Sequence, residues 1–465
     1  MYSVLRDVLQ KSNFQKVQAL RLLCVLLVGL LMSLPASANA QRMAVKGDQD
    51  KTIDSKMQAE IIDSVTQALN EIYVFPDVAK QMEKHLRKQY KKKKYKDLTS
   101  LMEFTQKLSE DLQEVSHDKH LRVMFMPDEM LAQFAGDTLT DDEKQRELEG
   151  RRRDNFCFKE VKLLEGNIGY VDLRCFSEAI DAGPTAIAAM NFLAYTDAII
   201  FDLRENGGGS PSMIQLISSY FFHEPVHLNS FYIRRSDSTQ QFWTQASVQG
   251  PRLTDVDLYV LTSSYTFSGA EEFTYNLKNM ERATIIGETT GGGAHPIDIR
   301  VFENLNAGMS LPFGRAVNPI TGTNWEGTGI TPHIEVPQEK ALDVAHLEAL
   351  KKLSEKSTDP DRQAELKWAL DGKHAELNPV TIEVSELRKY AGQYGPRKIW
   401  VEDGQLYYQR EDRPKSMLVP MGNHRFMLQG LNRFRIQFVV DENGEINELI
   451  GQYAGGHTDG HKRSK

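Results

Sequence analysis

The stretch YVLTSSYTFSGAEEF, Tyr259 to Phe273, decides the fold prediction for this chain of 465 residues. The apolar run Leu258 to Leu261 predicts a buried strand, and Gly269 to Phe273 predicts the first turn of a helix. A serine on such a strand-to-helix turn lies where backbone N–H groups and the helix dipole stabilise negative charge. Ser268 is therefore a candidate nucleophile, because attack on a carbonyl creates an oxyanion. The local alternative is a helix N-cap without chemistry.

Strands and helices alternate on both sides of this stretch, from Phe156 to about Val336. Apolar runs predict strands at 167–173, 197–203, 257–262 and 283–287. Helices are predicted between them, at 177–194 and 211–222. Alternation of this kind is typical of an α/β core in which helices pack on a sheet.

The chain before this core predicts a small helical domain. Apolar side chains recur at helical spacing over 57–73, and Pro76 is expected to end that helix. A second helix is predicted at 79–90. A third is predicted after Ser100, a candidate N-cap with Glu103 three residues later.

The sequence pattern changes after the core. Residues 341–379 predict a charged packing helix and a linker. After Pro379, short alternating runs surround Asp403-Gly404 and Asn443-Gly444, dipeptides that are typical of hairpin turns. We therefore expect a separate, small antiparallel β domain followed by a disordered tail. Inside the core region, the polar segment 137–154 predicts a long surface excursion.

The first 40 residues predict a secretion signal. Basic residues precede the mostly apolar run Leu22 to Leu34, and Ala38-Asn39-Ala40 offers the small residues that a signal peptidase reads, so cleavage is expected after Ala40. The run is too short to span a bilayer comfortably. We expect an exported protein, periplasmic or extracellular, without a stable membrane span. The net charge of −8 argues against nucleic acid as a partner.

Cysteine usage leaves one question open. Only Cys157 and Cys175 remain once the signal is removed. They could form one disulfide in an oxidising compartment, or stay as two buried thiols on neighbouring strands. No cysteine has the spacing of a zinc ligand.

Two glycine-rich turns and one glutamate are further candidates for a site. RENGGGSP places three glycines after a strand, where their N–H groups could stabilise an oxyanion or simply form a flexible turn. ETTGGGAHP, from Glu288 to Pro296, could line a cleft or turn the chain. Glu326 stands beside glycines before a final strand, and an exposed turn glutamate is its alternative. A phosphate loop is disfavoured, because no Lys-Ser/Thr follows the first turn.

Histidine is the commonest general base, and one pair of histidines lies close together in a folded segment. His117 and His120 follow the third predicted helix in the sequence SHDKHLRV. The pair His457 and His461 lies in the glycine-rich tail, which gives it little weight as a metal site.

Four motifs, in order, carry a resemblance to a known family. DLRENGGG, YTFSGAEEF, GETTGGG and EGTGITPHIEV make the chain similar to the tail-specific (C-terminal processing) serine proteases over roughly residues 52–340. The segment between His120 and Asn167 is too short and too charged for the PDZ domain of the processing proteases. The chain therefore resembles the branch without that domain, the interphotoreceptor retinoid-binding-protein-like and tricorn core members.

The resemblance also indicates which residue would act as the general base. Members with a PDZ domain use a serine–lysine dyad whose lysine lies in the second glycine-rich turn, but here that turn is Gly291-Gly292-Gly293-Ala294. The tricorn-like branch uses a histidine and a glutamate, which match His120 and Glu326. Its pattern has a serine just before the histidine, where this chain has Lys119. Since Ser116-His117 would restore such a pair, His117 remains the alternative base.

A mechanism follows from the resemblance. Ser268 attacks the scissile carbonyl, His120 takes its proton, and Glu326 orients the imidazole, as the acid does in serine triads. Water then releases the acyl-enzyme. No metal or organic cofactor is implied, and the partner is a peptide or protein substrate.

The oxyanion would be received by the N–H of Gly269 and by that of Gly207 or Gly208. Two alternatives use the same fold: a non-catalytic binding protein for apolar ligands or peptides, and an esterase. Substrate preference and oligomeric state stay open.

The resemblance completes the expected domain organisation. The implied fold class is α/β, with a crotonase/ClpP-like core, an N-terminal helical domain and a small C-terminal antiparallel β domain. The expected parts are a signal peptide at 1–40, the helical domain at 41–130, the core at 131–340, a helical linker at 341–379, the β domain at 380–455 and a disordered tail at 456–465.

Overall fold

The computed structural model describes residues 50–128, 130–131 and 140–464. They fall into two compact units, of which the second comprises Leu164–Ile168 and Asp343–Lys465. The expected signal peptide and its cleavage after Ala40 lie outside the described residues. Across the described ranges, no helix is long and apolar enough to cross a membrane.

A six-stranded sheet forms the centre of the first unit. Its order is β12-β8-β7-β4-β3-β2, and neighbours among β12, β8, β7 and β4 run parallel. The strands are β2 (Phe158–Leu164), β3 (Ile168–Leu173), β4 (Ala198–Asp202), β7 (Asp257–Thr262), β8 (Ala283–Gly287) and β12 (Ile334–Glu335). Every residue of β3 and β4 is buried, as expected for strands covered on both faces.

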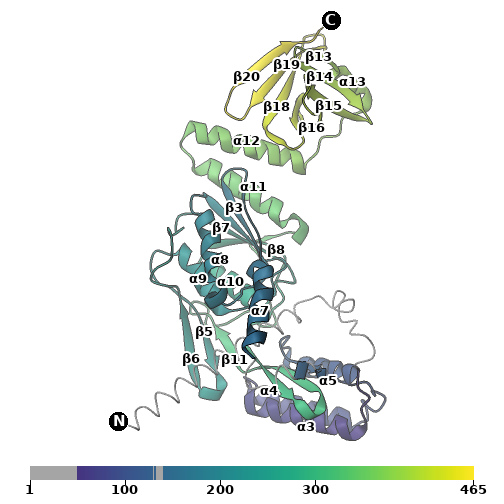
Figure 1. Ribbon diagram of the computed structural model, residues 1–465, viewed down its shortest axis with the longest axis vertical. Coiled ribbons are helices and arrows are strands. Elements are labelled where there is room, and N and C mark those ends of the chain that lie inside the picture. Colours follow the sequence, from purple (N-terminus) through teal and green to yellow (C-terminus); the bar gives the residue numbers. More distant parts are fainter. Residues whose placement is uncertain (1–49, 129, 132–139, 465) are drawn as a thin grey trace. The chain divides into compact units, whose positions relative to one another are not determined.

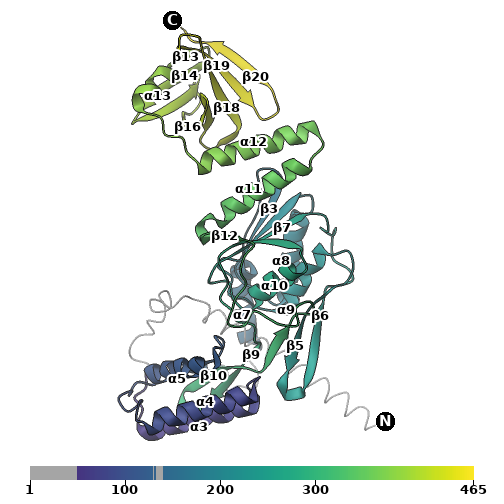
Figure 2. The same cartoon turned by 180° about the vertical axis from the view of Figure 1, so that it is seen from behind.

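Three helices pack beside one another against this sheet, as Figures 1 and 2 show. They are α8 (Ala179–Phe192), α9 (Pro211–Ser218) and α10 (Gly269–Asn279). Local sequence explains where α9 begins, because the Ser210 hydroxyl accepts the N–H of Ser212 and Pro211 occupies the first helical position. The predicted α/β alternation is confirmed.

The N-terminal region is helical, as predicted. It contains α3 (Ser55–Ile72), α4 (Pro76–Lys91) and α5 (Leu101–Ser116). Pro76 starts α4 instead of only ending α3, since a proline is tolerated at the first helical position. The N-cap at Ser100 is confirmed, with the N–H of Glu103 3.1 Å from its Oγ. The apolar faces of these helices share one core with Met309 and Leu311.

Two smaller antiparallel sheets complete the first unit. One has the order β1-β10-β9, with β1 (Arg122–Phe125), β10 (Ala307–Pro312) and β9 (Ile297–Phe302). The other has the order β11-β5-β6, with β11 (Gly314–Val317), β5 (His227–Ile233) and β6 (Ser238–Trp243). Because β1 pairs with β10, the segment just before β1 is tied to the rest of the unit.

Two features bear on predictions made from the sequence. One is a helix inside the expected surface excursion, and the other is the state of the two cysteines. Much of the predicted excursion 137–154 is helix α7 (Asp141–Arg153), which begins with a capping box between Thr140 and Glu143. Its mostly charged residues have no apolar period, so the sequence pattern does not predict a helix there. Cys157 and Cys175 form a disulfide, with a Cα–Cα distance of 5.4 Å.

The second unit combines helices with an eight-stranded antiparallel sheet. Its helices are α12 (Pro360–Leu377), α13 (Val384–Tyr390) and most of α11 (Gln338–Lys356). The strands follow chain order: β13 (Gly392–Tyr394), β14 (Arg397–Glu402), β15 (Gln405–Arg410), β16 (Ser416–Gly422), β17 (Arg425–Leu428), β18 (Leu431–Val440), β19 (Ile446–Tyr453) and β20 (Thr458–Lys462). A bridge between Tyr394 and Arg463 joins the first strand to the chain after the last, so the sheet is nearly a barrel.

One prediction about this region needs correction. The tail at 456–465, expected to be disordered, contributes β20, which backbone pairing with β19 holds in place although its residues have no apolar pattern. The region 341–379, expected to be a packing helix and a linker, contains α12 and most of α11, and the Trp368 indole N–H donates to the carbonyl of Asn432 at 2.8 Å.

Candidate active site

Ser268 lies on a strained turn between β7 and α10. Its φ and ψ are 53° and −119°, a conformation that residues with a side chain rarely adopt. The side chain is half-buried, and α10 begins with the next residue, Gly269. In the described part of the chain, the Gly269 N–H has no acceptor. The turn thus presents a hydroxyl next to an unused backbone donor.

Glu271 holds this turn. Its carboxylate is fully buried and accepts the N–H of Ser268 at 2.9 Å. It also accepts the Thr290 hydroxyl at 2.5 Å and the N–H groups of Gly292 and Gly293 at 2.7 and 2.8 Å. Burial raises the pKa of Glu271 to about 7, although these hydrogen bonds favour the ionised form. One side chain therefore fastens the Ser268 turn to the second glycine-rich turn.

Removal of the negative charge of Glu271 is expected to destabilise the first unit. In Glu271→Gln, an NH₂ group replaces one of the two accepting oxygens, so buried donors lose their acceptor. We expect the free energy of unfolding to fall by about 2–4 kcal/mol. Urea denaturation followed by circular dichroism measures this. Glu281→Gln, at an exposed position just beyond the same helix, is the control and should change the value by less than about 0.5 kcal/mol. Equal stability of the two variants would contradict the role of Glu271.

The first glycine-rich loop approaches the Ser268 turn closely. A Cβ atom at Gly208, where φ is 111°, would lie 2.7 Å from the Gly269 nitrogen and 2.9 Å from the Ser268 Cβ, so only glycine fits. The N–H of Gly208 donates to Asn206 Oδ1 at 2.8 Å. This amide is already engaged, which favours Gly207 of the two oxyanion donors that the sequence left open. Among the described residues, the Gly207 N–H has no acceptor.

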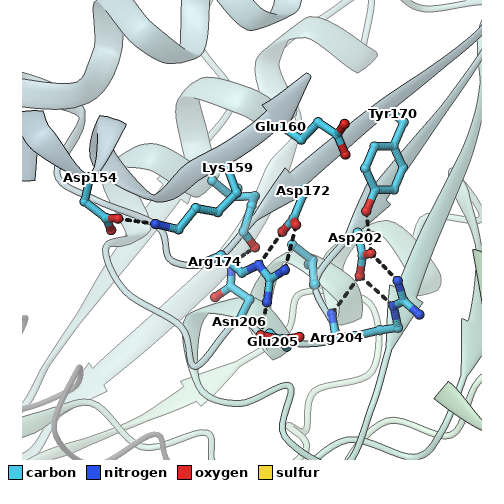
Figure 3. Close-up of polar contacts among 12 residues, drawn as sticks. Asp154, Lys159, Glu160, Tyr170, Asp172, Arg174, Asp202, Arg204, Glu205 and Asn206 are labelled. Atoms are coloured by element: carbon cyan, nitrogen blue, oxygen red, sulfur yellow. Dashed lines mark hydrogen bonds and ion pairs between the residues drawn. The ribbon is translucent and has the colours of Figure 1, made fainter. Parts of the chain in front are cut away.

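Two arginine–carboxylate pairs fix the base of this loop (Figure 3). Arg204 binds both oxygens of Asp202, which also accepts the Tyr170 hydroxyl at 2.7 Å. Burial would raise the pKa of Asp202, but the hydrogen bonds and charge of Arg204 lower it below its usual range. Arg174 likewise binds both oxygens of Asp172 and reaches Glu205. The residues just before the three glycines are thus rigidly held, which suits a loop that presents backbone donors.

His120 lies against the residue that precedes Ser268. It is 8% exposed, and its ring centroid is 4.6 Å from that of Phe267. A Cβ atom at Gly293 would lie 2.6 Å from the His120 Cε1 and 2.2 Å from the Phe267 Cζ. The imidazole therefore fills the space beside the Ser268 turn that the second glycine-rich turn leaves free.

His117 is placed differently. It is the left-handed C-cap of α5, with φ of 57°, and its side chain is exposed. Lys119, at the position where the tricorn-like pattern would place a serine, donates from Nζ to the carbonyl of Gly291 at 2.5 Å. Of the two candidate histidines, the structure buries His120 beside the Ser268 turn and leaves His117 exposed.

Glu326 meets His120 in a cluster with two residues that the sequence did not single out. One side-chain N or O atom of each of Asp118, His120 and Glu326 lies within 4.8 Å of the others. His295 Nδ1 is 2.7 Å from Asp118 Oδ2 and 3.4 Å from Glu326 Oε2. The N–H of Ala294 donates to Glu326 Oε2 at 2.5 Å. The buried atoms His120 Nδ1 and Glu326 Oε1 have no hydrogen-bond partner in the described structure.

Burial sets the protonation states in this cluster. It lowers the pKa of His120 to about 4, with the charge of Asp118 acting in the opposite direction. Burial raises the pKa of Glu326 to about 7, and the charge of Asp118 adds to this while His295 opposes it. The pKa of Asp118 is lowered, because the hydrogen bond and charge of His295 outweigh burial. At neutral pH, His120 is therefore neutral, as a general base must be.

The same cluster fits a hydrogen-bond network better than a metal site. Asp118 Oδ2 accepts from His295 and from the Tyr73 hydroxyl, and Oδ1 accepts the backbone N–H of His120. Its acceptor positions are used, so the carboxylate has little left to offer a cation.

Sequence reasoning missed Asp118, His295 and Glu271. Asp118 and His295 are 177 residues apart, and no period or spacing connects them. Their place in the sequence is the signal that could have found them. Asp118 lies between the two candidate histidines, and His295 lies in the motif ETTGGGAHP, directly after GGGA. Glu271 lies three residues after Ser268, where a capping glutamate would be expected.

Two family models match the chain. Peptidase family S41 matches residues 167–336, and the N-terminal domain of Peptidase_S41 in eukaryotic IRBP matches 53–148. Together the matches span more than half of the chain. The chain therefore belongs to peptidase family S41, a family of serine-type peptidases, as the sequence motifs predicted.

The solved structures that match parts of this chain are distant in sequence. A putative peptidase from Parabacteroides merdae is 19% identical, with a TM-score of 0.42, and the match covers 61% of this chain and 90% of that one. The photosystem II D1 C-terminal processing protease is 21% identical, with a TM-score of 0.31 and coverage of 37% and 43%. The tricorn protease is 14% identical, with a TM-score of 0.36 and coverage of 70% and 37%. The match thus spans less than half of the last two proteins.

Proposed function

We propose that this chain is an exported peptidase that cleaves peptide bonds through Ser268, His120 and Glu326. Ser268 is the nucleophile, neutral His120 takes its proton, and ionised Glu326 orients the imidazole and stabilises its cation. The core that holds these residues is of the crotonase/ClpP-like kind in this proposal. The export signal is the one predicted at 1–40.

One observation carries the proposal: two buried polar atoms without partners lie in the same small cluster. His120 Nδ1 and Glu326 Oε1 both lack a hydrogen bond among the described residues. A buried donor and acceptor are costly when unpaired, so an Nδ1–H···Oε1 bond is the arrangement that relieves both. That bond leaves Nε2 of His120 as the nitrogen that takes the proton of Ser268. Hydrogen bonds of this kind often tighten only when substrate is bound.

The oxyanion is received by backbone donors at the Ser268 turn. The N–H of Gly269 is unused in the described structure, directly after the nucleophile. The second donor is Gly207, since the Gly208 N–H is bonded to Asn206. Preorganised backbone donors of this kind stabilise charge that develops in the transition state without reorganisation.

A serine-directed phosphonate probe tests the nucleophile directly. The wild-type protein should gain one probe adduct, and mass spectrometry should place it on the peptide that contains Ser268. Ser268→Ala should gain none. Ser264→Ala, which alters an exposed serine in the same turn, is the control and should be labelled like the wild type. Labelling of Ser268→Ala to the same extent would overturn the assignment.

The same purified protein separates peptidase from esterase and from binding protein. Hydrolysis of a casein or peptide-library substrate supports the peptidase. Hydrolysis of esters alone supports the esterase, and absence of both with a retained apolar ligand supports the binding protein.

A further inference from the structure

His295 lies between the two carboxylates of the cluster. Its Nδ1 is 2.7 Å from Asp118 Oδ2, a charge-assisted hydrogen bond, and 3.4 Å from Glu326 Oε2, where charge attraction is the main interaction. All three side chains are largely buried, with exposures of 4%, 1% and 16% for His295, Asp118 and Glu326. Two carboxylates so close together cannot both remain ionised in such a place without a compensating cation.

No other cation of the described residues contacts this pair of carboxylates. Lys119 is directed to the carbonyl of Gly291, and Arg315 is exposed and interacts with the rings of Phe75 and Tyr232. The other groups that face the cluster are the neutral Tyr73 hydroxyl, which donates to Asp118, the backbone N–H of Lys119 beside Glu326, and His120 itself. The charge of Arg122 acts on His120, and its Nε donates to the carbonyl of Lys119 at 3.4 Å, not to either carboxylate. The compensating charge must therefore come from His295.

We propose that His295 is a positioning residue whose imidazolium cation bridges Asp118 and Glu326 and keeps Glu326 ionised as the acceptor for His120. The inference rests on the proposed function of Ser268, His120 and Glu326. His295 need not touch substrate, because it acts through the charge state of Glu326. Asp118 in turn holds the imidazolium in place through its Oδ2.

The directions of the pKa shifts agree with this assignment. Burial alone would lower the pKa of His295, but the hydrogen bond and charge of Asp118, together with the charge of Glu326, raise it above its usual value. The charge of His295 lowers the pKa of Glu326, which burial and Asp118 raise. Loss of the cation should therefore raise the pKa of Glu326 further and leave it protonated at neutral pH.

The pH dependence of kcat/KM is the readout that distinguishes this role from a structural one. Activity requires ionised Glu326 and neutral His120, and the pKa of His120, about 4, lies well below that of Glu326, about 7. As pH falls, Glu326 is protonated first, so the acidic limb of the wild-type profile should reflect a pKa of about 7.

The test variant is His295→Asn, because the asparagine amide replaces the Nδ1–H donor toward Asp118 without a charge. We expect the acidic limb to move upward by about one unit, which lowers kcat/KM about fivefold at pH 7 and about tenfold at pH 6 and below. Well above the shifted limb, the variant should approach wild-type activity. A merely structural role would instead lower activity by the same factor at every pH, and that result would overturn the proposal.

A matched control and a second measurement keep the test independent of folding. His333→Asn alters another histidine of the first unit, whose Nδ1 accepts the Ile285 N–H at 2.9 Å, and should leave the acidic limb in place. An NMR titration of the imidazole of His295 in the wild-type protein should show the cation at neutral pH. A neutral ring would overturn the proposal without any variant.

The two proposals can fail separately. If Ser268→Ala retains activity, the triad is wrong. If Ser268→Ala is inactive while His295→Asn keeps the wild-type acidic limb, the triad stands and only the role of His295 is wrong.

Discussion

Replacement of Ser268 by alanine is expected to lower kcat/KM by about 10⁴- to 10⁶-fold, the range seen when the nucleophile of a serine triad is removed. The loss should be chemical and not structural. The positive φ of this turn is about equally unfavourable for alanine and for serine. The hydrogen bond from the backbone N–H of residue 268 to Glu271 does not involve the Ser268 side chain. Hydrolysis of a fluorogenic casein substrate by purified protein measures the change.

Two controls accompany this variant. Ser264→Ala should keep activity within about twofold of the wild type, since its side chain lies on the exposed side of the same turn. The thermal unfolding midpoint of Ser268→Ala should match the wild type. A Ser268→Ala protein that is folded and still active would show that the nucleophile lies elsewhere.

The second large effect is expected at His120. His120→Ala should lower kcat/KM by about 10⁴-fold or more, because among the described residues no other neutral imidazole lies beside the Ser268 turn to take the proton. His117→Ala should remain within about twofold of the wild type. Its side chain is exposed at the end of α5, and its backbone N–H donates to the carbonyl of Gln113, a bond that the substitution leaves intact.

The comparison of these two variants decides between the bases considered from sequence. Both proteins should be assayed over the same pH range, so that a shifted profile is not mistaken for loss of the base. An inactive His117→Ala together with an active His120→Ala would reverse the assignment.

The fold was predictable wherever apolar residues repeat with a clear period. The strands and helices around Ser268 and the N-terminal helices follow from such patterns. Helix α7 could not be predicted from such a pattern, because its stability comes from a capping box and surface charge instead of an apolar face. Strand β20 could not be predicted in this way either, since backbone pairing with β19 forms it and its sequence TDGHK contains no apolar side chain.

The site was predictable only in part, for a similar reason. Ser268 and the glycine loops could be singled out, since strand-to-helix turns and glycine runs have local signatures. The bridge from Asp118 through His295 to Glu326 joins three distant segments, and its energy depends on burial, which no single segment reveals. The resemblance supplied His120 and Glu326, but the cation that compensates two carboxylates became evident only from their distances.

The close approach at Gly293 has a consequence for any other residue at this position. A Cβ atom at 293 would collide with His120 and Phe267, so a side chain here would need the volume that the imidazole occupies. The sequence resemblance implies that processing proteases with a PDZ domain carry a catalytic lysine in this turn. In this chain a lysine at position 293 could be accommodated only if the glycine turn and the His120 segment moved apart.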